Sequence, residues 1–167
     1  MPDKVMQSNL ENNPVVDYRA RLLEQLLKST DDFCAACRSA KDPVKPIVGD
    51  EWSIQRIAQH VRDVNAQSYT LRVQRTLTEE VPVFPKFDAE QWAQQHTDAD
   101  EPLEKILAEF QEGIYSMVDE LKAQPGDAWS RLGRHEIQGY RTLQLWVERC
   151  LEHIREHRET ITTRTGK

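Results

Sequence analysis

The sequence contains no apolar run that approaches the about 18 residues needed to cross a membrane. Residues 1–16 include Asn, Asp, Glu and Pro and lack the apolar stretch of a signal peptide. There is no excess of basic residues: 22 Lys+Arg against 28 Asp+Glu give a net charge of −6, which argues against a nucleic-acid binder and a polybasic membrane anchor. The three cysteines are an odd set, so we expect no disulfide framework. These absences favour a reduced, cytoplasmic domain.

Internal repeats and sustained period-2 alternation are also missing, so strand signals are almost absent. With 167 residues, 38% of them apolar and 30% charged, the chain fits one helical domain with charged outer faces. Four segments of about 20 residues, each roughly 30 Å long as a helix, predict an all-α four-helix bundle. The domain is expected at 17–162, between a flexible segment at 1–16 and a tail at 163–167. The apolar residues recur at helical spacing within residues 17–38, 54–78, 102–124 and 142–162.

The sequence also contains residues that mark the start of a helix, and one long connection between helices. Ser53 is a good N-cap, and Trp52 before it can pack on Ile57 inside the helix. A Pro-punctuated connection at 81–101, with one short turn capped by Asp88, separates the second and third helices. Its length allows an up-down-down-up order but does not exclude up-down-up-down.

Three of the five histidines stand beside apolar stripes. His60 borders the stripe of the second helix, and His153 and His157 lie one turn apart on the fourth. His60 is about 10 Å past the start of its helix and His157 a similar distance before the end of its own, so in antiparallel helices all three meet at one level. Three neutral imidazoles would hold a divalent ion with one position open. The alternative is that they are only a polar flank or hydrogen-bonded core groups.

A series of short motifs appears in a characteristic order. They are Trp52-Ser53-Ile54, Ile57-Ala58-Gln59-His60, Pro85-x-Phe87-Asp88-x-x-x-Trp92, Gly139-Tyr140-Arg141-Thr142-Leu143 and His153-x-x-x-His157. Together they resemble the DinB-like (YfiT-like) superfamily, over residues 17–162.

This resemblance implies an up-down-down-up four-helix bundle with a divalent metal held by His60, His153 and His157. It also implies a small-molecule substrate and, in many members, a homodimer. Family members include transferases that use a low-molecular-weight thiol, a thiol-dependent maleylpyruvate isomerase and proteins described as metal-dependent hydrolases. Imidazole ligands suit several transition metals, of which we expect zinc or nickel.

The cysteines have alternative roles. Cys34-x-x-Cys37 has redox-motif spacing but lacks the βαβ context of a thioredoxin, so Cys37 is interpreted as a small core residue. Cys150 is expected to pack in the core. Because it lies close to His157 in position around the axis of the fourth helix, it is also considered as a soft metal ligand.

Other polar side chains are harder to place. His96 is expected to be solvated, and His135 lies roughly 20 Å from the predicted metal unless its loop folds back. Arg62, Arg72 and Arg75 are interpreted mostly as a solvated face, in which nothing selects one for a substrate carboxylate.

Three functions remain open at this point. The first is a metal-dependent enzyme that activates a thiol or water for transfer or hydrolysis, with catalytic residues beyond the metal ligands unknown. The second is a non-catalytic metal- or small-molecule-binding stress protein without an accessible fourth position. The third is a helical dimerisation module whose histidines are hydrogen-bonded core residues.

Overall fold

Four helical rods build the molecule, and the computed structural model describes them within residues 13–165. The second rod is continuous but changes its helical type twice along its length. The rods are α2 (Pro14–Arg38), then α3 (Ile54–Val64) with η1 (Asn65–Thr70) and α4 (Leu71–Thr78), then α6 (Leu103–Lys122), and finally α7 (Leu143–Thr165).

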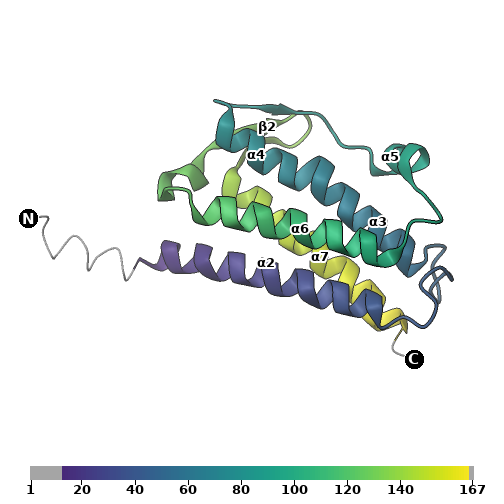
Figure 1. The fold of residues 1–167 in the computed structure, drawn as a ribbon. Helices are drawn as coiled ribbons and strands as arrows, with labels where there is room; N and C mark the ends of the chain where they lie inside the picture. Colours follow the sequence, from purple (N-terminus) through teal and green to yellow (C-terminus); the bar gives the residue numbers. More distant parts are fainter. Residues whose placement is uncertain (1–12, 166–167) are drawn as a thin grey trace, which may run out of the picture.

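The rods follow the up-down-down-up order. In Figure 1, α2 and α7 run in one direction, while the α3–α4 rod and α6 run in the other. The connection after α4 travels back along the bundle before α6 begins, and it carries α5 (Ala89–His96) on the way. The four-helix bundle predicted from the sequence is therefore confirmed, with the long connection in its predicted place.

Both ends of the helical region extend beyond their predicted limits. Asn13 caps α2, its side-chain oxygen accepting a hydrogen bond from the Val15 backbone N–H at 2.9 Å, and Pro14 follows as the first helical residue. At the other end α7 continues to Thr165. The rest of the predicted flexible segment, 1–12, and the end of the predicted tail, 166–167, lie outside the described residues.

The predicted helix starts are largely as expected. Ser53 Oγ accepts a hydrogen bond from the Arg56 backbone N–H at 3.1 Å, which caps α3. Asp88 Oδ1 accepts a hydrogen bond from the Gln91 backbone N–H at 2.9 Å. The predicted short turn in the connection is therefore the capped helix α5. Pro102 is the residue before α6 rather than its first helical residue.

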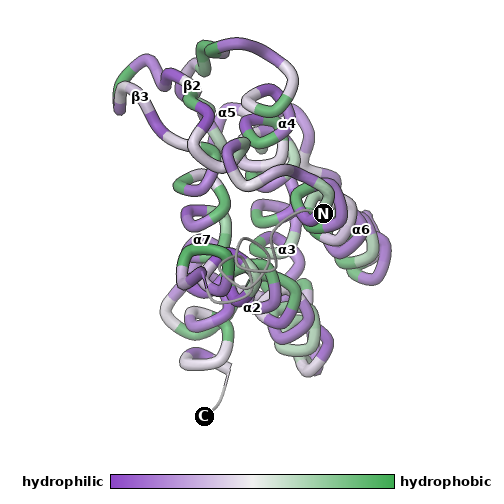
Figure 2. Tube along the Cα trace, turned by 90° about the vertical axis from the view of Figure 1, so that its left-hand side faces the viewer, coloured by the Kyte–Doolittle hydropathy of each residue, from purple (hydrophilic) through white to green (hydrophobic). Residues whose placement is uncertain are grey.

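A small sheet, which the sequence did not predict, covers one side of the bundle. It consists of β1 (Val83–Phe84), β2 (Leu132–His135) and β3 (Gly139–Thr142), with β1 parallel to β2 and β2 antiparallel to β3. Figures 1 and 2 place it beside α4, on the side away from α2. The strands have at most four residues, too few for an alternating pattern to stand out.

The core lies between the rods, and in Figure 2 hydrophobic and hydrophilic residues alternate around each helix. Phe33 and Phe110 meet edge to face at 5.5 Å between ring centroids, and Trp146 is buried where α7 faces the sheet. Cys34, Cys37 and Cys150 are buried free thiols, and burial raises the pKa of Cys34 to about 12. Within residues 13–165, we find no helix with the length and apolar character of a membrane span.

Candidate metal centre

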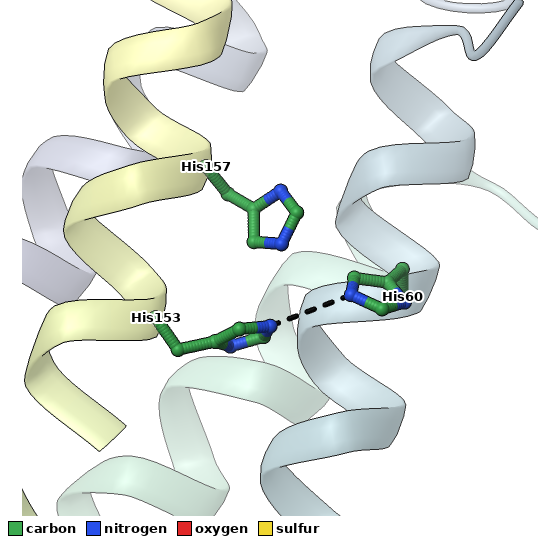
Figure 3. Close-up of side chains that lie close together, drawn as sticks. All are labelled: His60, His153 and His157. Carbon is green, nitrogen blue, oxygen red and sulfur yellow. Dashed lines mark hydrogen bonds between the residues drawn. The ribbon is translucent and has the colours of Figure 1, made fainter. Parts of the chain in front are cut away.

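The bundle brings His60, His153 and His157 together between two antiparallel rods. His60 projects from α3, and the other two project from α7 one helical turn apart (Figure 3). One ring nitrogen from each side chain can be chosen so that all three lie within 4.8 Å of one another. The spacing on α7 and the matched level on α3 therefore produce the cluster that the sequence indicated.

The separations suit ligands of a single ion. The Nε2 atoms of His60 and His153 are 3.4 Å apart. Two nitrogens bound to one tetrahedral zinc ion, at bonds of about 2.0–2.1 Å, are roughly 3.3 Å apart. His157 lies close to both rings, at centroid distances of 4.9 Å from His60 and 4.7 Å from His153. Small rotations of the imidazoles would direct all three nitrogens at one point.

The imidazoles are held in the neutral form that a metal requires. Burial lowers the pKa of His60 to about 4, with further lowering by His157 and Arg56 nearby. Burial likewise lowers the pKa of His153 to about 3, and it lowers that of His157. At neutral pH each ring keeps a lone pair available for coordination.

Aromatic side chains pack on two of the imidazoles. The Trp52 ring, just before α3, meets the His60 ring at 5.1 Å, and the Tyr69 ring in η1 lies 5.6 Å from that of His153. Among residues 13–165, no carboxylate or thiol joins the three histidines within ligand distance. The donor set is thus three imidazole nitrogens.

Cys150 has a different partner. It donates a hydrogen bond from Sγ to Asn65 Oδ1 at 3.1 Å, and Asn65 in turn donates from Nδ2 to Thr70 Oγ1 at 3.2 Å. This chain of bonds ties α7 to η1, a π-helical segment that starts five positions after His60. The structure therefore places Cys150 in the packing role and not among the ligand atoms.

Two hollows reach the histidines. One, of about 520 Å³, is lined by His60 and His153 together with residues of α4, the connection and the β2–β3 hairpin. The other, of about 490 Å³, lies between Trp52, His60 and α5. Their volumes are in the range of small-molecule sites. A small molecule can therefore approach the cluster from the side of the long connection.

His135 is nearer to this region than the sequence analysis expected. The β2–β3 hairpin folds back over α4, so that His135 is buried and lines the 520 Å³ cavity with His60 and His153. Its Nδ1 accepts hydrogen bonds from the Ile137 and Gln138 backbone N–H groups, both at 3.2 Å. The proton of the neutral ring is therefore on Nε2. Sequence reasoning made this position conditional on the loop folding back, and it could not decide the point because the strand pairing that returns the loop to the bundle has no local signal.

The remaining polar candidates divide into exposed and buried groups. His96 is exposed, as predicted, and stacks on Trp92 at 3.8 Å. Arg62 is ion-paired with Asp63 and Glu101, and Arg75 is ion-paired on the surface. The prediction of a solvated face is wrong for Arg72, which is only 9% exposed because the sheet covers its part of α4. It also fails for Arg62, whose side chain is 15% exposed.

Comparison with known proteins gives a family and a fold. Residues 16–161 match the family model of the DinB superfamily. No curated protein matches the chain. Among solved structures, YfiT from Bacillus subtilis, described as "a probable metal-dependent hydrolase with an unusual four-helix bundle topology", matches with a TM-score of 0.72 and 22% sequence identity, over 88% of this chain and 87% of that chain. Identity at this level shows a shared fold.

Proposed function

The chain belongs to the DinB superfamily, and from this premise we propose that it is a metal-dependent enzyme acting on a small molecule. His60, His153 and His157 would hold one divalent ion, with zinc or nickel expected. The observation that carries the proposal is the convergence of three neutral imidazoles from two rods, with Nε2 atoms of His60 and His153 at 3.4 Å. Three nitrogen donors with an approach for a fourth ligand are typical of a reactive site.

The residues around the cluster have separable roles in this proposal. Trp52 and Tyr69 pack on two of the imidazoles and limit their rotation. The connection and the hairpin line the approach to His60 and His153. A divalent ion held there would supply a Lewis acid that lowers the pKa of a thiol or of water.

The type of reaction is a narrower part of the proposal. Hydrolysis is supported by the description of YfiT as a probable metal-dependent hydrolase. Transfer of a low-molecular-weight thiol, a homodimer and a cytoplasmic location are further predictions from the family resemblance and the composition. The two hollows that reach His60 favour an enzyme over a closed, non-catalytic metal site.

Metal content tests the site directly. Untagged protein would be purified as wild type, as His157→Ala and as His96→Ala, the last being a matched control at an exposed histidine. We expect about one equivalent of metal in the wild type and in the control, and a loss in His157→Ala with the helical circular-dichroism signal retained. If the wild type takes up neither zinc nor nickel when these are added, the histidines are packing groups and the proposal is wrong.

A further inference from the structure

Arg72 is a buried cation without an anionic partner. Its side chain lies on α4, is 9% exposed and makes no hydrogen bond or ion pair with any residue of 13–165. Arg62 and Arg75 on the same rod are each paired with carboxylates. The Arg72 nitrogens are not among the fully buried unpaired atoms of the described residues, so the guanidinium opens onto the adjoining cavity. A largely buried guanidinium is normally paired, because losing most of its hydration without compensation is costly. The isolation of Arg72 therefore calls for a partner from outside the chain.

Packing explains one face of this guanidinium only. The guanidinium carbon of Arg72 lies over the buried indole of Trp146, 4.8 Å from the ring centroid. Such a cation–π contact uses the flat face of the group. The five N–H donors lie in the plane of the guanidinium and stay available at its edges.

Arg72 lines the 520 Å³ cavity beside the histidines and a neighbouring hollow that also contains Asp88. The 520 Å³ cavity is cationic, although the whole chain carries a net charge of −6. Lys86 from the connection and His135 from β2 line it as well, and no Asp or Glu is among its lining residues. The nearby Glu136 carboxylate accepts a hydrogen bond from the Lys86 backbone N–H at 2.6 Å. His135 adds a second donor, because its Nδ1 is occupied and its Nε2 has no partner among the described residues.

We propose that this cavity binds the anionic oxygen group, carboxylate or phosphate, of a small-molecule ligand, with Arg72 as its main contact and His135 Nε2 and Lys86 as additional donors. A guanidinium fork matches either anion through two parallel N–H···O bonds. The apolar part of the ligand would lie against Tyr69, Phe87 and Ile137, which line the same cavity.

This inference gives the proposed enzyme a substrate class, and in that respect it rests on the proposed function. The cavity is lined at one part by Arg72 and at another by His60 and His153. A ligand anchored by its anionic group at Arg72 would place its remaining atoms toward the histidine cluster. The substrate would then be a small organic anion whose reacting bond lies away from its charged group.

Binding of defined probes tests the proposal without any turnover. Benzoate, phenyl phosphate and the neutral benzamide would be titrated by calorimetry into the protein as purified and after removal of metal by a chelator. The variants are Arg72→Gln, Arg72→Lys and Arg38→Gln, which removes an exposed, surface-paired arginine on α2. Working with and without metal separates this site from the histidine cluster.

We expect at least one of the two anions to bind more tightly than benzamide, and the tighter one identifies the preferred group. Arg72→Gln should lower the affinity for that anion by about tenfold or more, because a charged hydrogen-bond donor is lost. Arg72→Lys should lower it by less. Arg38→Gln and the affinity for benzamide should stay within about twofold of wild type, since a surface charge contributes little.

Equal affinity for the anions and benzamide, no binding of either anion, or an unchanged affinity in a folded Arg72→Gln would each overturn the proposal. Because that variant can fail to fold, the Arg72 Nε–Hε resonance of the wild type provides a second readout, and an anion that leaves it unmoved also overturns the proposal. Arg72-dependent anion binding in a protein that takes up no metal would keep this site while refuting the metal enzyme. Metal uptake without anion binding would refute the anion site while keeping the proposed metal site.

Discussion

At the scale of single residues, Glu101 shows how the chain compensates a buried charge internally. The carboxylate is buried just before α6 and accepts hydrogen bonds from Arg62 Nη1 at 2.7 Å, Lys105 Nζ at 3.0 Å and Gln59 Nε2 at 3.2 Å. Burial by itself would raise the pKa of Glu101, but these donors outweigh it and lower the pKa to about 2. The network joins the end of the long connection to α3, the helix that carries His60.

The network predicts a specific dependence of stability on acid. Because the pKa of Glu101 is about 2 in the folded protein and 4.5 otherwise, the unfolded chain binds more protons between these values. The stabilisation is complete above pH 4.5 and is lost as the pH falls toward 2. Glu101→Gln should lower the free energy of unfolding at neutral pH by an amount on the order of 2–3 kcal/mol, and this deficit should shrink across that window. Urea unfolding at a series of pH values measures it.

Glu104→Gln is the matched control for this experiment. Glu104 lies three positions further along the chain and is paired with Arg38 at the surface. Its loss should change the free energy of unfolding by less than about 1 kcal/mol. A Glu101→Gln deficit that stays constant from neutral pH to pH 2 would show that the carboxylate acts by packing rather than by charge.

The position of a side chain could be predicted from the sequence where the residues that determine it are close along the chain. His153 and His157 follow from a spacing of four on one helix, and His60 from its level on a rod of similar length. Arg72 and His135 gave no such signal, because their burial depends on a hairpin that pairs with β1 some 50 residues away along the chain. The sequence therefore predicted the histidine cluster but not the placement of Arg72 and His135 in the cavity beside it.

At the scale of elements, the sheet depends on a close approach at Gly133. A Cβ atom at this position in β2 would overlap the Phe84 ring of β1 and meet Thr76 Oγ1 of α4 at 3.1 Å. The bare backbone of Gly133 therefore lets β2 lie directly against α4 and β1. This contact helps to hold the hairpin that carries His135 into the cavity.

Substituting this glycine should disturb both stability and the cavity. Gly133→Ala is expected to lower the free energy of unfolding by about 1–3 kcal/mol, the usual cost of overpacking, and to weaken anion binding by displacing His135. Thermal unfolding and the probe titrations described above measure the two effects.

Gly113→Ala tests whether the effect belongs to that position. Gly113 is in the interior of α6, where a Cβ atom would meet only Asn65 Nδ2 at an ordinary 3.8 Å. Alanine favours a helix over glycine by about 0.5–1 kcal/mol, so this variant should be slightly more stable than wild type. Equal stability losses in both variants would contradict the argument for close packing at Gly133.

Helices were predictable from sequence because each repeats its pattern over many residues, whereas the other elements are short. Caps at Ser53 and Asp88 marked two starts correctly. The π-helical turn of η1 has no sequence signature of its own and is stabilised by tertiary contacts such as the hydrogen bond between Cys150 and Asn65. The strands likewise form because α4 and the connection provide a surface and a partner for the hairpin.

At the scale of the whole molecule, the histidine cluster joins two rods that are distant in the chain. His60 and His153 are 93 residues apart in sequence, yet their Nε2 atoms are 3.4 Å apart. The unfolded chain cannot keep three such groups together, so an ion bound by them would bind the folded state almost exclusively. Metal binding should therefore be coupled to the stability of the entire bundle.

This coupling predicts a shift in the thermal unfolding of the protein. A ligand present at about 100 times its dissociation constant stabilises the folded state by about 2.7 kcal/mol, which for a chain of this size raises the midpoint by about 5–10 °C. Scanning calorimetry of chelator-treated wild type, before and after adding zinc or nickel, should show this rise, and His157→Ala should not. An equal rise in both proteins would mean that the metal acts elsewhere on the surface. The same scan on Arg72→Gln should retain the full rise, because the anion site and the histidine cluster contribute to folding through different ligands.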